Sequence, residues 1–424
     1  MSTLVLSTLN SVVEQALTRN GNQVITAVPF PLLAKRRDAS PHTPFVGVRR
    51  WNDLSELQNL AYSIDGVNAV MTVDEQCVAA AGFIRDTLGI PGQSYRNALQ
   101  MTNKHLMKLA LVASKEDIRV ARHEVAHSVG EILTAGERMG YPLILKPVSG
   151  FGAIATYKVE SKKHLRELVA RGAFEQEIPE PSGRASASDG VFQGLFSNEK
   201  GGFIVEQYIN VVKEFFCEMI WFGGRPIMKV VAQYSTPVLD LIGKPSGVVT
   251  LDPRSDDYAT VIELSTKACT ALNMTEGFAH CEVMQDAAGQ WWFGEAAARP
   301  GGQEIVGLTS RLLGYDIHDV VTSLANHEQP KIDSEYKYPL LASSIPLIPP
   351  GRVLQVPSRD DVLSLDRVVD VEIKCKPGDV SIGSHHSTDA AAAFIFFEPS
   401  SLQGAMGEME QLASSFKVDI DTAA

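Results

Sequence analysis

Residues 275–302 read TEGFAHCEVMQDAAGQWWFGEAAARPGG, and this stretch decides the fold because it predicts a β-hairpin that carries acidic side chains. Its first arm covers residues 277–285 and its second covers residues 290–299, with small and polar residues between them that suit a tight reversal. Directly opposed residues of an antiparallel pair share one face of a sheet. The hairpin therefore predicts that Glu282 faces Glu295.

The register of this hairpin depends on its turn, which we expect to be centred between Ala288 and Gly289. Side chains alternate between the two faces of a strand, so His280, Ala297 and Arg299 are expected on the same face as the two glutamates. The sequence thus predicts that two carboxylates and a guanidinium group converge.

Two opposed carboxylates need a positive partner, because like charges that face each other on a ladder are destabilising. The flanking aromatic and alanine residues predict a partly dry setting, which raises this cost. Magnesium would fit, since it takes oxygen ligands from one or two carboxylates and completes its shell with water and substrate phosphates. From this stretch alone an alternative stays open, in which one carboxylate pairs with Arg299 or a nearby lysine on a solvated sheet face.

Length and composition are typical of a soluble globular protein with about two to four domains or subdomains. The chain of 424 residues carries a formal net charge of -12, which argues against binding to nucleic acid or to an anionic membrane surface. Its start lacks the pattern of a signal peptide, and no apolar run reaches membrane-spanning length. Five scattered cysteines are typical of reduced thiols, so we expect a cytoplasmic protein.

The first hundred residues alternate between strand and helix patterns. Strands are expected at residues 3–6, 23–28 and 67–73, with helices at residues 11–18 and 75–88. This alternation predicts a parallel, Rossmann-like sheet. No GxGxxG motif opens either helix, so a dinucleotide is not expected there.

A glycine-rich loop follows a strand that carries a lysine. The strand is expected at residues 141–147 and includes Lys146, the loop runs from Ser149 to Gly152, and a second strand is expected at residues 153–159. Backbone N–H groups of such a loop could cover phosphates while Lys146 approaches them as a point charge. An ordinary hairpin with a lysine at its edge is the alternative.

The other elements are predicted from periodicity and composition. Helices are expected at residues 101–113, 123–139, 162–171, 256–272, 303–313, 317–325 and 402–416. Strands at residues 202–209, 214–222 and 226–234 are expected to form an antiparallel meander, and strands dominate from residue 340 onward. Residues 179–190, PEPSGRASASDG, are expected to form a mobile loop that could act as a lid, and His385 and His386 are expected in an exposed loop.

Five features in this order resemble the ATP-grasp superfamily: Lys104, the strand that ends in Lys146 and Pro147, the glycine loop, VEQYI and EAAARPGG. The resemblance covers about residues 65–330. Within the superfamily the chain is most similar to the carboxylate–amine ligases that join L-amino acids into dipeptides. It implies an α/β fold, α+β in the ATP-grasp part. The implied parts are an N-terminal Rossmann-like domain (1–103), an ATP-grasp lid subdomain (104–205) and a C-terminal antiparallel-sheet domain (206–424) with a strand-rich extension from about residue 340.

The resemblance also implies the roles of individual residues. The nucleotide would be held by Lys104, Lys146, the flap Ser149, Gly150, Phe151, Gly152 and Ala153, the connector Glu206, Gln207, Tyr208 and Ile209, and Glu214. Glu282 and Glu295 would bind two magnesium ions, and Lys229 and Arg299 would act on the reacting phosphoryl group. The substrate would lie near Glu75, His280, Gly301, Gly302 and Gln303. Glu75 has helix-start capping as its alternative role.

One position departs from the superfamily pattern. Ala297 stands two residues after Glu295, where an asparagine is most often a third metal ligand in the superfamily, so the resemblance implies a metal site that lacks this ligand.

The chemistry that the resemblance implies is transfer of the γ-phosphoryl group of ATP to an amino-acid carboxylate, followed by attack of an amine on the acyl phosphate. Fixed positive charges would stabilise the phosphoryl oxygens, and loop closure would exclude water. Two other interpretations remain: an ATP-grasp ligase with another acceptor, such as a carrier-protein thiol or a biosynthetic amine, and a catalytically silent nucleotide-binding protein. The superfamily often forms dimers, so a homodimer is also expected.

Overall fold

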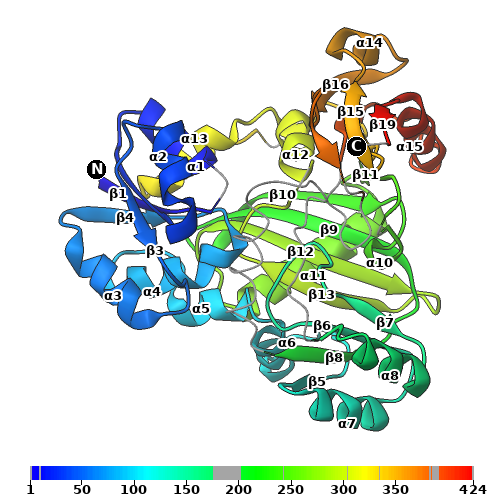
Figure 1. Cartoon of the computed structure of the whole chain (residues 1–424), viewed down its shortest axis with the longest axis horizontal. Helices are drawn as coiled ribbons and strands as arrows, with labels where there is room; N and C mark the ends of the chain where they lie inside the picture. The colour runs from blue at the N-terminus through cyan, green and yellow to red at the C-terminus, as the bar shows by residue number, and fades with distance from the viewer. Residues whose placement is uncertain are drawn as a thin grey trace.

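The computed structural model describes residues 2–8, 11–174, 202–241, 243–302, 304–333, 335–381, 383 and 391–422. The described residues form four β-sheets. Figure 1 shows the N-terminal part (blue) to one side of a long central sheet (green), a lid sheet (teal) below it and the C-terminal strands (orange and red) above it.

The N-terminal sheet is parallel, with strand order β3-β2-β1-β4, which confirms the Rossmann-like domain. Its strands are β1 (Ser2–Leu6), β2 (Gln23–Pro29), β3 (Phe45–Val48) and β4 (Val67–Met71). Its helices are α1 (Val12–Arg19), η1 (Phe30–Leu32), α2 (Leu33–Ala39), α3 (Leu54–Ser63), η2 (Glu75–Cys77), α4 (Val78–Leu88) and α5 (Tyr95–Gln100). The loops after β1 and β4 leave the carboxyl ends of these strands and bring Thr8 and Glu75 to a cleft.

The lid sheet is antiparallel, with strand order β5-β8-β6-β7. Its strands are β5 (His123–Ala126), β6 (Leu143–Pro147), β7 (Tyr157–Val159) and β8 (Phe203–Gln207), and its helices are α7 (Val129–Met139) and α8 (Lys162–Ala170). Helix α6 (Lys104–Ala113) precedes this sheet, and the side chain of Asn103 caps it by accepting from the N–H groups of His105 and Leu106.

Three sequence-based expectations are wrong in this region. Residues 123–139 are not one helix, because β5 pairs with β8 and Ser128 then caps α7. Strand β7 begins only at Tyr157, since Ala153 and Ala155 adopt positive φ angles of 56° and 52° that end the extended conformation. Strand β8 joins the lid sheet rather than a meander with β9 and β10.

The central sheet has the strand order β13-β12-β9-β10-β11-β14-β18-β16. Its strands are β9 (Val211–Phe222), β10 (Arg225–Tyr234), β11 (Ser246–Thr250), β12 (Gly277–Asp286), β13 (Trp291–Ala297), β14 (Ala342–Ile345), β16 (Val368–Ile373) and β18 (Ala393–Phe397). The surrounding helices are α10 (Val238–Leu241), α11 (Asp256–Ala271), α12 (Ile305–Leu313), α13 (Ile317–Ala325), α14 (Arg359–Leu363) and α15 (Gly404–Ser415). A small sheet contains β15 (Gly351–Gln355), β17 (Val380–Ser381) and β19 (Asp419–Asp421).

The two faces of the central sheet pack against different layers. Cys281 and Val283 of β12 belong to the core that α11 covers, whereas Phe278 belongs to the core beneath α12 and α13. Because side chains alternate along a strand, His280 and Glu282 lie on the same face as Phe278. The sheet thus holds its polar residues at one end of the face that α12 and α13 partly cover.

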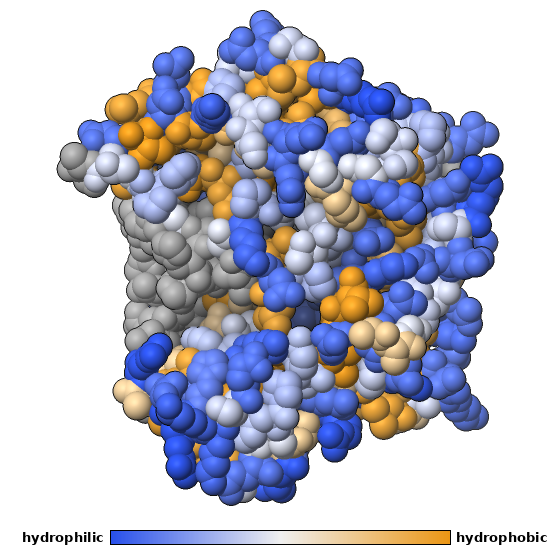
Figure 2. All heavy atoms as spheres, turned by 90° about the vertical axis from the view of Figure 1, so that its right-hand side faces the viewer, coloured by the Kyte–Doolittle hydropathy of each residue, from blue (hydrophilic) through white to orange (hydrophobic). Residues whose placement is uncertain are grey.

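The remaining structural expectations concern membranes, cysteines and domain limits. Within the described part of the chain, every helix is too short or too polar to span a bilayer. The five cysteines are all buried. The face in Figure 2 is mostly hydrophilic among the coloured residues, with hydrophobic residues in separate groups. The boundary expected between residues 205 and 206 falls inside β8, so we propose that the lid subdomain ends after Gln207.

Candidate active site

A cleft with a cavity of about 830 Å³ lies where the N-terminal, lid and central sheets meet. This volume is within the usual range for a small-molecule site. Most of the residues predicted from sequence line it, namely Glu75, Lys104, Lys146, Gly150, Phe151, Gly152, Ala153, Glu206, Gln207, Tyr208, Ile209, Glu214, His280, Glu282, Glu295, Arg299, Gly301 and Gly302. The fold therefore brings together residues separated by more than 200 positions in the sequence.

The acidic hairpin has the expected register at its functional end. Glu282 of β12 lies directly opposite Glu295 of β13, and His280 lies opposite Ala297. Residue 297 supplies no ligand atom, so the pair Glu282 and Glu295 is the carboxylate set that this hairpin offers to a metal ion. Among the described residues there is no cluster of three or more His, Cys, Asp or Glu residues arranged to hold a metal.

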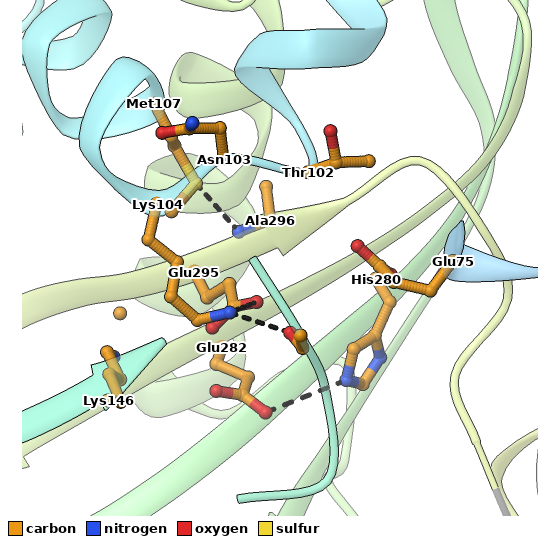
Figure 3. Close-up of polar contacts among 12 residues, drawn as sticks. Glu75, Thr102, Asn103, Lys104, Met107, Lys146, His280, Glu282, Glu295 and Ala296 are labelled. Carbon is orange, nitrogen blue, oxygen red and sulfur yellow. Dashed lines mark hydrogen bonds and ion pairs between the residues drawn. The ribbon is translucent and has the colours of Figure 1, made fainter. Parts of the chain in front are cut away.

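A lysine from α6 joins this pair to the glycine loop. Lys104 Nζ lies 3.0 Å from Glu295 Oε1 and donates a hydrogen bond of 2.7 Å to the carbonyl oxygen of Gly150 (Figure 3). Burial opposes ionisation of Glu295, but Lys104 and then Lys146 outweigh it and lower the pKa of Glu295 below its usual value. The resulting carboxylate is a charged oxygen ligand.

The pKa of Glu282 is shifted in the opposite direction to that of Glu295. Burial, and then the charge of Glu295, raise the pKa of Glu282 above its usual value. The imidazole of His280 stands on its other side, with Nε2 at 3.9 Å from Glu282 Oε1 (Figure 3). A divalent cation between the two glutamates would relieve this repulsion, and two carboxylates are what magnesium usually takes from a protein when phosphates supply the rest.

A buried charge cluster supports the lysine of the glycine hairpin. The carboxylate of Glu206 lies 3.2 Å from Lys146 Nζ and 3.4 Å from Lys108 Nζ. Burial raises the pKa of Glu206, but Lys108 and Lys146 more than offset this and lower it to about 2. Lys108 was not identified from the sequence, although its position one helical turn after Lys104 on α6 was the available signal.

A second missed residue, Glu218, organises the far side of the hairpin. It lies opposite His280 in the pairing of β9 with β12, and its Oε2 is 3.0 Å from His280 Nδ1. Its Oε1 accepts a hydrogen bond of 3.0 Å from the backbone N–H of Gly301. Glu218 therefore fixes both the imidazole ring and the backbone of the loop after Arg299. The register of β9 with β12 could have revealed it.

Arg299 and Glu75 meet across the cleft from different domains. Arg299 Nε donates to Glu75 Oε2 at 2.8 Å, and its Nη1 donates to the carbonyl oxygen of Pro300 at 2.9 Å. Burial works against the charge of Arg299, but Glu75, Glu218 and Glu295 raise its pKa. Glu75 thus holds the arginine, and neither of the two roles considered from sequence, an amine ligand or a helix cap, describes this contact.

Glu214 lines the cleft at the other end of the glutamate pair. Its Oε2 accepts a hydrogen bond of 2.7 Å from the N–H of Val238 at the start of α10. Burial, and then the charge of Glu282, raise its pKa to about 8.

Two predicted residues within the described part of the chain, Lys229 and Ser149, do not line the cleft. Lys229 is exposed on β10 and pairs with Met219, which lies on the face covered by α11, so its side chain is on the wrong face to reach a nucleotide. Ser149 belongs to the glycine loop but is not among the lining residues. Gln303, like the loop at residues 179–190 and the pair His385 and His386, lies outside the described residues.

L-amino acid ligases are among the known proteins that this chain resembles in sequence and in structure. No family model matches the chain. The L-arginine-specific L-amino acid ligase of Bacillus subtilis is 27% identical over 283 residues, which are 66% of this chain and 63% of that protein. The crystal structure of an L-amino acid ligase from Bacillus licheniformis matches with a TM-score of 0.72 and 16% identity over 99% of both chains.

A second solved structure is also similar in fold. The biotin carboxylase domain of the Hydrogenobacter thermophilus 2-oxoglutarate carboxylase, in complex with MgADP, ADP and bicarbonate, matches with a TM-score of 0.63 at 14% identity. The match covers 99% of this chain and 90% of that one. The chain therefore has the fold of these proteins.

Proposed function

We propose that this chain, whose homologues and structural neighbours are ATP-grasp carboxylate–amine ligases, is itself an ATP-dependent ligase of amino acids. It activates the carboxylate of one amino acid as an acyl phosphate and joins it to the amine of another, with release of ADP and phosphate. The carrying observation is the directly opposed pair Glu282 and Glu295 beside Lys104 and the Gly150 loop. The names of the two Bacillus proteins support amino acids as the substrates.

We propose that Glu282 and Glu295 hold magnesium, in two ions, at the nucleotide phosphates. The fit rests on the donor set, because two half-buried carboxylates face each other and the pKa of Glu282 is raised by burial and by Glu295. When bound, magnesium supplies charge neutralisation at the transferring phosphoryl oxygens.

The residues of the chain contribute position and charge. Lys104 and Lys146 bind phosphate oxygens, and Gly150 to Ala153 cover them with backbone N–H groups. Arg299, oriented by Glu75, stabilises the negative charge that develops when the carboxylate oxygen attacks the γ-phosphorus and ADP leaves. The amine then attacks the acyl carbon, phosphate leaves, and the amine loses a proton. Exclusion of water matters because the acyl phosphate hydrolyses readily.

The test is a mass-resolved screen of pairwise L-amino-acid mixtures with ATP and magnesium, combined with measurement of ADP release. The expected result is a dipeptide mass for at least one mixture, formed together with equal ADP. ADP release only after addition of a carrier protein or another amine would instead identify a different acceptor. Nucleotide binding without ADP formation under any of these conditions would identify a silent nucleotide-binding protein.

A further inference from the structure

Glu304 is a buried carboxylate of the cleft that has no role in the proposed chemistry. Glu304 stands immediately before α12, is 4% exposed and lines the cleft. Its side chain does not cap the helix that it precedes. Its carboxylate accepts hydrogen bonds from its own backbone N–H and from the hydroxyl of Ser343 on β14, which donates to Oε1 at 3.4 Å. A long bond from a neutral hydroxyl is weak support for a buried anion.

Other carboxylates of this cleft have closer partners, including Glu214, whose Oε2 accepts from the N–H of Val238 at 2.7 Å. Glu75 pairs with Arg299, Glu206 with two lysines, and Glu295 with Lys104. In the part of the chain that the structure describes, no lysine or arginine forms an ion pair with Glu304. His280 acts on it only through space, because that ring is already bonded to Glu218. Burial accordingly raises the pKa of Glu304 to about 7.

The wall beside Glu304 is apolar and belongs to adjacent strands of the central sheet. Tyr234 of β10 lies opposite Val248 of β11, which lies opposite Ser343 of β14. Ile345, two residues after Ser343, shares its face and also lines the cleft. Tyr234, Val248 and Ile345 thus form an apolar wall that crosses β10, β11 and β14.

Two further side chains show how this wall relates to the reacting centre. Tyr234 lines the cleft together with Glu282, Glu214 and Glu304, and burial and then the charges of these carboxylates raise the pKa of its phenol. Phe394 of β18 continues the apolar wall beyond Tyr234 and Ile345. The space therefore begins near the proposed metal ligands and passes along an apolar surface with a carboxylate beside it.

We propose that Glu304 binds the cationic side chain of a basic amino-acid substrate, whose aliphatic part lies along the wall formed by Tyr234, Ile345 and Phe394. This assignment rests on the proposed ligase function, which supplies an amino acid to the same cleft. A long side chain with an ammonium or guanidinium end suits such a surface, because its methylene groups bury against apolar residues while the charge meets the carboxylate. Lys374 also lines the cleft, where its ammonium group pairs with Glu372 at 3.6 Å and lies 4.7 Å from the ring centre of Phe394.

A different explanation would make Glu304 a protonated acid that serves packing alone. In that case a glutamine, which has the same shape and still accepts from Ser343, would replace it without consequence for any substrate. A role in binding the α-amino group would weaken all amino acids alike. The three explanations therefore predict different affinities. Only binding of the substrate side chain predicts that a cationic amino acid binds more tightly than its neutral analogue and that this preference is lost when Glu304 loses its charge.

The test compares L-arginine with L-citrulline, its neutral isostere, and L-lysine with L-norleucine. Each amino acid is titrated calorimetrically into the protein with magnesium and a non-hydrolysable ATP analogue. We expect the wild type to bind each cationic amino acid about 10-fold to 100-fold more tightly than its neutral partner, as for a charge-assisted hydrogen bond. Glu304→Gln should lose this ratio while its affinity for citrulline and its thermal unfolding stay unchanged.

Two further variants separate charge from packing. Ser343→Ala keeps the carboxylate and should keep most of the preference, whereas Glu328→Gln, an exposed glutamate after α13, should change nothing. Equal wild-type affinities within each pair, or an unchanged ratio in Glu304→Gln, would overturn the assignment of Glu304 and leave the ligase proposal standing if ADP is released. Absence of binding by every amino acid, without ADP release in the amino-acid screen, would overturn both.

Discussion

Glu282 and Glu295 face each other because of a bulge at Gly294. Near the turn Gln285 pairs with Trp291, so the turn is centred one half-residue earlier than the sequence suggested, and the register shifts between Glu282 and Val283. A β-carbon at position 294 would lie 3.1 Å from the carbonyl oxygen of Glu282, which is tighter than most such contacts. Glycine therefore permits the bulge that aligns the two carboxylates.

Glu295→Gln should abolish ligation while the protein still folds. The amide keeps the shape of the side chain but removes one of the two negative charges available to magnesium, so we expect at least about 100-fold loss of turnover. Stabilisation of the protein against heat by MgATP should fall to the level seen with ATP and a chelator. Dipeptide mass spectrometry and thermal unfolding measure these two effects.

The matched control is Glu263→Gln, which alters an exposed glutamate paired with Lys267 on α11. It should turn over like the wild type. Wild-type activity in Glu295→Gln itself would remove the metal site from the proposal.

Much of the fold could be predicted because long elements carry their own pattern. The alternating strands and helices of the N-terminal sheet and the hairpin from Gly277 to Ala297 have periodicities that span many residues. Strand β5 could not be recognised in this way, because its four residues, HEVA, are too few to show alternation. Its extended conformation depends on pairing with β8, about 80 residues later in the chain.

The part of the site that is formed by the recognised sequence motifs could be predicted. Lys104, the glycine loop and the acidic hairpin converge as expected, although their separate roles stay predictions. Glu218 and Glu304 were missed because their partners come from other elements and no local spacing reveals them. Their identification needed the register of neighbouring strands and the contacts across the cleft. Lys108, by contrast, could have been found from its spacing with Lys104 on α6.

Lys229 shows how a local irregularity can turn a side chain away from the place that a family resemblance implies. A register shift between Pro226 and Met228 on β10 changes which face the following residues occupy. Lys229 therefore points away from Glu282.

Substitution of Lys146 should weaken ATP binding, whereas substitution of Lys229 should have little effect. Lys146→Met should raise the KM for ATP at least about 10-fold, because Lys146 lines the cleft and is held by Glu206. Lys229→Met should leave kcat and KM within about twofold of the wild type, as is usual for an exposed side chain away from a site. Steady-state kinetics with varied ATP measures both. A large rise in KM for Lys229→Met would restore its expected contact with the nucleotide.

Glu206 should make stability depend on pH in the acid range. Its pKa is lowered from 4.5 to about 2, so its stabilising contribution is complete above about pH 5 and is lost as the pH falls toward 2. The full contribution is on the order of 3 kcal/mol. The difference in unfolding free energy between the wild type and Glu206→Gln should therefore shrink from pH 5 to pH 3, as measured by urea denaturation.

An exposed carboxylate provides the comparison for this pH dependence. Glu167 on α8 lies 3.8 Å from Lys163, and both side chains are solvent-exposed. Glu167→Gln should differ from the wild type by less than about 1 kcal/mol at every pH. A difference for Glu206→Gln that stays constant from pH 5 to pH 3 would mean that the two lysines do not control its ionisation.

The contact between Arg299 and Glu75 predicts a non-additive pair of substitutions. Arg299→Lys should lower kcat at least about 100-fold, because a single ammonium group does not reproduce the contacts of the guanidinium group to Glu75 and Pro300. Glu75→Gln should lower kcat less. If Glu75 acts by positioning Arg299, the double variant should be no slower than Arg299→Lys alone.

The same pair of variants separates positioning from direct binding of the substrate amine. An amine ligand would show itself as a raised KM for one amino acid with kcat retained in Glu75→Gln, and its effect would add to that of Arg299→Lys. We expect the non-additive result, because Glu75 Oε2 already accepts from Arg299 at 2.8 Å. A carboxylate that already accepts from Arg299 orients this arginine from the N-terminal domain. We therefore expect Glu75→Gln to act mainly on kcat and not on the KM for the amine substrate.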